Sequence, residues 1–213
     1  MKFVAFLFTS LLMVLNVAFA EQGIKQLSEK NRMCSMTAEQ APSIRSFRLG
    51  MTVKDVALRL NSQTGSAVLG QLAQWKARPT YTGLFGIEIT SQQFASLQES
   101  EGIKYITFNF LNERLYQYRV DYFGEAKWQN IKQFVDLVSP TLKLHQKWEM
   151  PNDRTASLDC GGFKIDASLN GMLGEPSLTI TDNWRKQETV KRKEESTKKK
   201  QEEEEKRRRD FKP

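Results

Sequence analysis

Hydrophobic residues recur with two different periods along the chain, and the period changes near residue 83. Residues 52–60 (TVKDVALRL) carry apolar side chains at helical spacing, namely Val53, Val56, Ala57 and Leu60. This spacing predicts an amphipathic helix with one apolar face. Beyond residue 83, apolar and polar residues alternate, as in half-buried strands. The pattern predicts an α+β fold in which helices pack on one face of an antiparallel sheet.

The strongest hairpin is predicted from two alternating segments, residues 104–110 (KYITFNF) and 115–123 (LYQYRVDYF). They are joined through Asn112, Glu113 and Arg114. On the first segment the shared face holds Ile106, Phe108 and Phe110; on the second it holds Tyr116, Tyr118, Val120 and Tyr122. Such aromatic rows are typical of a core; a stacking platform for ligand or nucleic acid would need Arg and Lys interleaved on the same face.

Three further segments after residue 83 complete the predicted sheet. Residues 86–90 (GIEIT) form a short strand. Residues 157–160 (SLDC) and 163–169 (FKIDASL) flank Gly161 and Gly162, which predicts a second hairpin. On the second of its strands the inward side chains are Phe163, Ile165, Ala167 and Leu169. After a turn at Asn170 and Gly171, residues 177–181 (SLTIT) add the last strand.

The helix ends are marked by local chemistry. Residues 43–49 alternate, with Ile44, Phe47 and Leu49 apolar, which predicts a strand that turns through Gly50 into the first helix. Thr52 is predicted as its N-cap and Asp55 as the N3 residue of a capping box. A second helix is predicted over residues 125–138, ending before Pro140. These features assign residues 47–60 to the scaffold of the fold.

Residues 44–60, with a short strand, Gly-Met-Thr and an amphipathic helix, resemble the entry module of a group of small exported alpha+beta proteins. The group comprises the small-protein-A outer-membrane lipoproteins and the beta-lactamase inhibitor protein. The resemblance implies a helical pair packed on an antiparallel sheet and a role in protein binding. It carries over no site residue.

The chain begins with features of a secretory signal peptide. Lys2 precedes an apolar run, and Ala18-Phe19-Ala20 provides a small-residue cleavage pattern before Glu21. We therefore expect cleavage after Ala20 and a periplasmic or secreted protein; an uncleaved anchor is the alternative. The predicted organisation is a signal peptide over residues 1–20, one α+β domain over 21–184, and a charged helical tail over 185–213.

The net charge of +7 belongs mostly to the tail. Residues 185–213 contain 13 Lys and Arg against 8 Asp and Glu, which leaves 19 against 17 for residues 1–184. Glu precedes Lys or Arg by four residues at several positions of the tail, the orientation that stabilises a solvated helix. Two roles fit this segment: a spacer, or an element that makes weak contact with anionic polymer or lipid. The nearly neutral body predicts no specific nucleic-acid partner.

Few residues suggest catalysis or metal binding. Cys34 and Cys160 are the only cysteines, and an even count in an exported chain predicts a disulfide; two unpaired thiols are the alternative. His145 is the only histidine, and Glu149 alone is spaced to join it as a metal ligand, whereas a stable site needs three or four ligands. No cofactor and no catalytic residue are predicted. We expect a non-enzymatic binding or envelope-accessory protein with a protein partner in the cell envelope. The alternative is a small secreted hydrolase with a carboxylate or Cys/His site.

Overall fold

In a computed structural model of the chain, the described residues are 34–96, 101–123, 128–144, 146–171 and 174–210. The chain divides into two units, residues 1–35 and 36–213. Cys34 and Ser35 are the described residues of the first unit. The signal peptide predicted over residues 1–20 lies outside the described residues.

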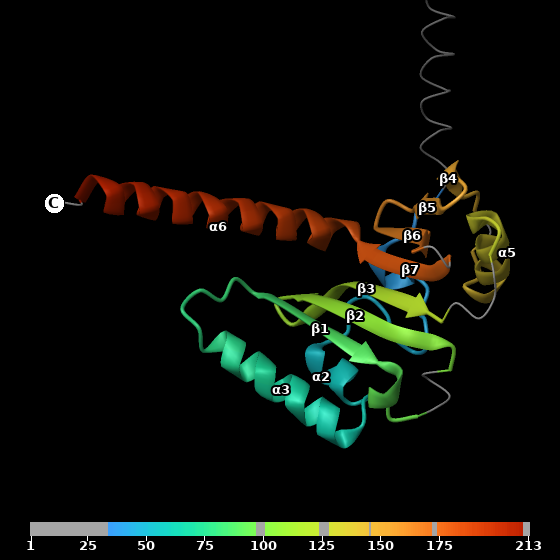
Figure 1. Cartoon of the computed structure of the whole chain (residues 1–213), viewed down its shortest axis with the longest axis horizontal. Coiled ribbons are helices and arrows are strands. Elements are labelled where there is room, and N and C mark those ends of the chain that lie inside the picture. Colours follow the sequence, from blue (N-terminus) through green and yellow to red (C-terminus); the bar gives the residue numbers. More distant parts are fainter. Residues whose placement is uncertain (1–33, 97–100, 124–127, 145, 172–173, 211–213) are drawn as a thin grey trace, which may run out of the picture. The chain divides into compact units, whose positions relative to one another are not determined.

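One seven-stranded antiparallel sheet organises the second unit (Figure 1). Its spatial order is β1-β2-β3-β7-β6-β5-β4, so two consecutive meanders join where β3 pairs with β7. The strands are β1 (Leu84–Thr90), β2 (Ile103–Leu111), β3 (Arg114–Tyr122), β4 (Glu149–Asn152), β5 (Thr155–Asp159), β6 (Phe163–Asn170) and β7 (Glu175–Asp182). The predicted α+β class with an antiparallel sheet is confirmed.

The core lies between one face of this sheet and the helices that pack on that face. The predicted inward rows of β2 and β6 are buried there, with Phe108, Phe110, Phe163 and Ile165 at 0% exposure. Helices α2 (Val53–Ala57) and α3 (Ser62–Lys76) cover the β1 side, and α5 (Ile131–Thr141) packs on β5 and β6. Figure 1 shows α2 and α3 beneath strands β1 to β3, with the C-terminal helix α6 (Asn183–Asp210) above them.

The capping box predicted for the first helix is confirmed. The Thr52 amide donates to Asp55 Oδ2 at 2.9 Å, and the Asp55 amide donates to Thr52 Oγ1 at 3.0 Å. The strand predicted over residues 43–49 is wrong: the segment forms only an isolated bridge, between Ile44 and Phe47. Its residues turn too tightly to pair with the sheet, and Gly50 completes the turn at φ +82°.

Helix α3 was not predicted, because its sequence contains glycine and glutamine in place of a strong apolar stripe. Gly65 explains part of this composition. A Cβ atom at Gly65 would lie 2.6 Å from the carbonyl oxygen of Ala57, so only glycine allows α3 to approach α2 this closely. Val68 and Leu72 supply the buried side of the helix.

The predicted hairpin is confirmed, with a correction to one face. Asn112 and Glu113 form a two-residue turn with positive φ angles of 49° and 62°. A register shift after Asn109 pairs Phe110 with Leu115, so Leu115 takes the core position beside Tyr118 that the alternation assigned to Tyr116. Tyr116 interacts instead with Thr189 of α6.

The second predicted helix is also confirmed, but its ends differ. α5 begins after the N-cap Asn130 and continues to Thr141, with Pro140 inside its last turn. The prediction that the helix ends before Pro140 is therefore wrong. Strand β4 was not predicted because all four of its residues are exposed at the edge of the sheet and lack alternation.

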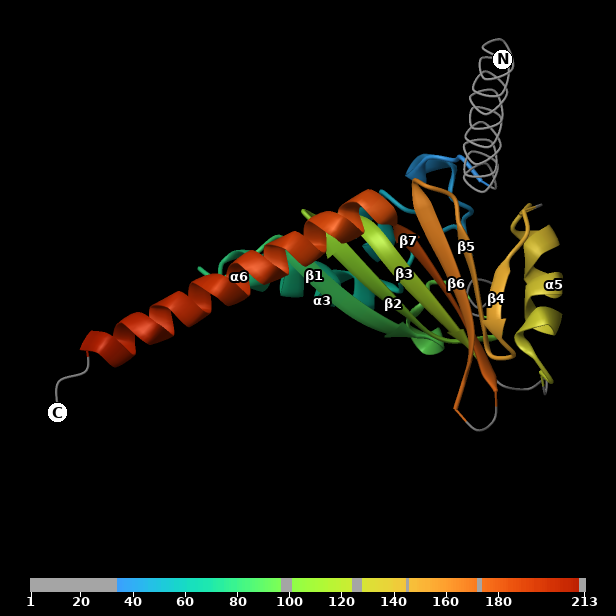
Figure 2. The same ribbon diagram turned by 90° about the horizontal axis from the view of Figure 1, so that it is seen from above.

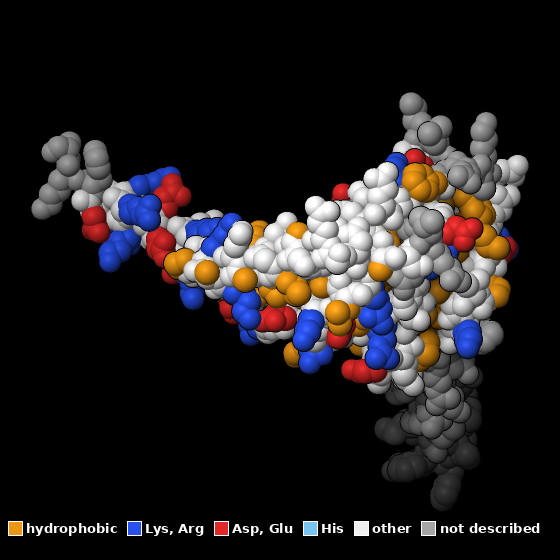
Figure 3. All heavy atoms as spheres, turned by 90° about the horizontal axis from the view of Figure 1, so that it is seen from below, with side chains coloured by type: hydrophobic (Ala, Val, Ile, Leu, Met, Phe, Trp, Pro, Cys, Tyr) orange, Lys and Arg blue, Asp and Glu red, His pale blue; other side chains and the backbone are white. Residues whose placement is uncertain are grey.

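Helix α6 docks on the domain through its first turns and then projects from it. Arg185 forms a 2.6 Å ion pair with Asp182, and Thr189 is 1% exposed. Arg192 Nη1 donates to the Thr82 carbonyl oxygen and to Asn112 Oδ1. From residue 197 to 210 every helical residue is exposed, and Figure 3 shows Lys and Arg alternating with Asp and Glu along this part. Glu204 and Arg208 form an ion pair, one of the contacts that the four-residue spacing of Glu before Lys or Arg predicts for this segment.

Candidate interaction surface

The face of the sheet opposite α2, α3 and α5 carries polar side chains. Figure 2 shows α3 behind strands β1 to β3 and α6 crossing in front of them near one end. We call this side of the sheet the polar face. Strand alternation and pairing assign to it Glu88, Tyr105, Thr107, Asn109, Gln117, Arg119, Asp121, Ser157, Lys164, Asp166, Ser168, Asn170, Ser177, Thr179 and Thr181.

An ion pair on β3 lies at the centre of the polar face. Arg119 donates from Nε and Nη2 to the two carboxylate oxygens of Asp121, at 2.8 and 2.7 Å. This hydrogen bond raises the pKa of Arg119. The Asp121 side chain is 8% exposed, whereas that of Arg119 is 40% exposed. The pair therefore holds the guanidinium group in a fixed orientation, with one edge toward solvent.

Tyr105 adds an aromatic side chain beside this ion pair. It lies opposite Asp121 in the β2–β3 pairing and is half-buried. Burial raises the pKa of Tyr105, and the neighbouring Asp121 carboxylate raises it further. Tyrosine and arginine are the residue types enriched at the centres of protein interfaces. We refer to Tyr105, Arg119 and Asp121 as the central cluster.

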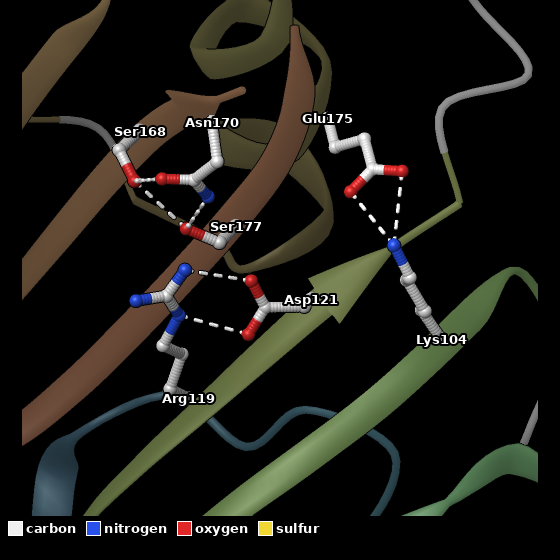
Figure 4. Close-up of polar contacts among 7 residues, drawn as sticks. All are labelled: Lys104, Arg119, Asp121, Ser168, Asn170, Glu175 and Ser177. Atoms are coloured by element: carbon white, nitrogen blue, oxygen red, sulfur yellow. Dashed lines mark hydrogen bonds and ion pairs between the residues drawn. The ribbon is translucent and has the colours of Figure 1, made fainter. Parts of the chain in front are cut away.

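Further polar groups around the central cluster are bonded to one another (Figure 4). Lys104 Nζ lies 3.0 and 2.9 Å from the Glu175 carboxylate oxygens, and this hydrogen bond raises the pKa of Lys104. The hydroxyls of Ser168 and Ser177 lie 2.8 Å apart, and Asn170 Nδ2 donates to the Ser177 hydroxyl at 2.9 Å. These contacts restrict the side-chain rotamers before any partner arrives.

A second network continues the polar face toward the end where α6 docks. Asn109 Nδ2 donates to Gln117 Oε1 at 3.2 Å, and Gln117 Nε2 donates to Thr181 Oγ1 at 3.0 Å. The three residues lie on neighbouring strands, in the order β2, β3 and β7. Since bonded side chains lose less conformational entropy when a partner binds, the polar face is preorganised for contact with another molecule.

Cys34 and Cys160 are both disulfide-bonded, as predicted, and neither is a free thiol. His145, which the sequence pairs with Glu149 as a possible metal ligand, lies outside the described residues. Among the described side chains, no group of three or more His, Cys, Asp or Glu could hold a metal ion.

The sequence contained part of the information for the polar face. The alternation that predicted the inward rows also fixes the outward residues between them, including Arg119 and Asp121. The hydrogen bonds between β6 and β7, and between β3 and β7, could not be found in this way, because they depend on the order of strands in the sheet.

No protein-family model, no curated protein and no solved structure matches the chain. Within the described part of the chain, none of the helices combines the length and apolar character needed to cross a bilayer.

Proposed function

We propose that the protein is an exported, non-enzymatic binding module that acts in the periplasm or outside the cell after cleavage following Ala20. Its polar face docks on a protein partner of the cell envelope, with Arg119 and Tyr105 at the centre of the contact. The exposed part of α6 is a spacer. The observation that carries the proposal is the polar face itself: its side chains are preorganised by hydrogen bonds, and α6 crosses it only near one end.

Forming an interface has a cost in side-chain conformational entropy. An exposed arginine or tyrosine must lose side-chain freedom on binding, which costs roughly 0.5 to 1.5 kcal/mol for each immobilised side chain. Arg119 has already lost part of this freedom through its bidentate contact with Asp121. Its Nη1 atom has no hydrogen-bond partner among the described residues, so it is available to an acceptor on the partner.

Two other observations support export and binding. The Cys34–Cys160 disulfide is the kind of bond that persists in oxidising compartments outside the cytosol. The resemblance of residues 44–60 to the small exported alpha+beta proteins favours protein binding. Under this proposal no cofactor is required.

Site-specific photo-crosslinking in living cells tests the proposal. A benzophenone amino acid at Thr179, which lies beside Arg119 in the β3–β7 pairing, should give a discrete adduct with an envelope protein. The matched control places the same amino acid at Gln74, an exposed residue of α3 on the other side of the sheet. The Thr179 adduct should be lost when Arg119→Ala is introduced.

Two results would contradict this function. Equal crosslinking from Thr179 and Gln74 would show that the contact is non-specific or lies outside the polar face. A Thr179 adduct that persists with both Arg119→Ala and Tyr105→Ala would show that the central cluster does not contribute to the interface. Urea unfolding of each purified variant separates lost binding from lost folding, because the binding proposal requires the variants to remain folded.

A further inference from the structure

A cavity of about 760 Å³ lies away from the central cluster, between the loop that precedes α2, the start of β3 and the start of α6. Arginine side chains line it from four separate segments: Arg48, Arg59, Arg114 and Arg185. The carboxylates among its lining residues are Glu39 and Asp55. The volume is within the range of small-molecule sites, about 300 to 1,000 Å³.

The four guanidinium groups differ in how far they are already satisfied. Arg185 is neutralised by its ion pair with Asp182. Arg59 donates from Nη1 to the Asp55 carbonyl oxygen at 3.0 Å, and Arg114 donates from Nη1 to the Gly50 carbonyl oxygen at 3.2 Å. Each guanidinium has five N–H donors, so Arg59 and Arg114 retain most of theirs.

Arg48 has no side-chain hydrogen bond or ion pair with any described residue, and it is exposed at the cavity. The backbone at Arg48 is anchored by its neighbours, because the Phe47 and Leu49 side chains on either side are 0% and 7% exposed. The fold therefore presents this guanidinium at the cavity without supplying a partner for it.

The two carboxylates of the lining do not satisfy these donors. Asp55 Oδ2 accepts from the amide and the hydroxyl of Thr52, and these bonds lower the pKa of Asp55. The pKa of Glu39 is lowered chiefly by a backbone hydrogen bond and by Thr37. Both acids are held chiefly by hydrogen bonds within their own helical turns. Arg59 and Arg114 make a smaller electrostatic contribution at Asp55, and Arg185 makes one at Glu39. Among the described residues, no carboxylate lies within 4.0 Å of the Arg48, Arg59 or Arg114 guanidinium nitrogens.

We propose that this cavity binds an oxyanion, the carboxylate or phosphate group of a small molecule, with Arg48 and Arg114 as its principal ligands and Arg59 in support. The planar guanidinium fork matches the two oxygens of either group, which a lysine ammonium does not. The site is separate from the polar face, so it stands or falls independently of the proposed protein partner.

Titration calorimetry of the full mature chain tests the site, with inorganic phosphate and citrate as the two probes and chloride added to hold the ionic strength constant. We expect saturable binding of at least one probe. Phosphate alone would identify a phosphate ligand, citrate alone a carboxylate ligand, and both the shared oxyanion chemistry. Arg48→Gln should weaken binding by about tenfold or more, since charge-assisted hydrogen bonds are lost.

Two variants act as controls for this experiment. Arg207→Gln, on the exposed part of α6, makes the same change of charge and should leave the affinity unchanged. Arg48→Lys keeps the charge but loses the fork, so it should bind less tightly than the natural protein and more tightly than Arg48→Gln. Unfolding midpoints show that each variant is folded.

The proposal is overturned if neither probe binds saturably to the folded protein. It is also overturned if Arg48→Gln and Arg207→Gln weaken binding equally, because the effect would then be general attraction to a basic chain. If folded Arg48→Gln binds with unchanged affinity, Arg48 is not a ligand, and the proposed site is refuted as well.

Discussion

Removing one hydroxyl group from the core should destabilise the protein measurably. Tyr118 is 0% exposed, and its hydroxyl lies 3.1 Å from the carbonyl oxygens of both Pro42 and Phe47. It thereby attaches the loop before α2 to the centre of the sheet. The Tyr118→Phe variant keeps the ring but removes this donor. The part-buried Pro42 carbonyl oxygen then loses its contact, whereas the Phe47 carbonyl oxygen still accepts from the Ile44 amide. We expect a cost of about 1 to 3 kcal/mol.

Urea unfolding followed by tryptophan fluorescence measures this cost. With a slope of about 2 kcal/mol per molar urea, a loss of about 2 kcal/mol lowers the midpoint by about 1 M while the slope stays constant. Tyr81→Phe is the matched control, because the Tyr81 hydroxyl is buried without a hydrogen-bond partner among the described residues. Its removal should leave the midpoint unchanged or raise it. Equal midpoints for the two variants would refute the assigned role of the Tyr118 hydroxyl.

Thr52→Ala should lower the free energy of unfolding by roughly 0.5 to 2 kcal/mol through loss of the cap, and a urea midpoint within error of the natural protein would contradict it. A chain ending at Arg192 should keep the thermal midpoint of the full chain, whereas one ending at Asp182 should melt lower; equal melting of the two would mean that the docked turns contribute nothing. Burial raises the pKa of Tyr122 to about 12. Because the unfolded chain loses this proton first, near pH 10, stability should fall between about pH 10 and 12, and urea midpoints of Tyr122→Phe across that range should fall less steeply.

Most of the sheet could be predicted because its strands are long and alternate clearly. The inward rows of β2 and β6 are among the least exposed residues of the protein, as their spacing required. Elements without a periodic pattern were missed or misjudged. Gly65 allows α3 to pack closely against α2, but it weakens the helical pattern of the sequence. The register shift at Phe110 gives Leu115 the core position that the alternation assigned to Tyr116, and the local sequence pattern does not reveal this shift.

The sequence contained more information about the central cluster than about the arginine-lined cavity. Arg119 and Asp121 are two residues apart on one strand, so the alternation alone places them on the same face. The arginines of the cavity come from segments that are up to 137 residues apart in the sequence, between Arg48 and Arg185. Residues 47–60 were assigned to the scaffold on the basis of their capping box. The structure adds that the same segment carries Arg48 and Arg59 to the cavity.

The distribution of charge along α6 favours the spacer over the anion-binding tail. Of the net +5 over residues 185–213, the docked turns to Arg192 contribute +3 and residues 211–213 contribute +1. Residues 193–210 contain 8 Lys and Arg against 7 Asp and Glu, a net charge of only +1. At about 1.5 Å per residue, this part is roughly 27 Å long. A nearly neutral helix of this length, with charges of both signs close together, gains little from a distant anionic surface because its own charges screen each other, so its length is a better guide to its role than its basic residues.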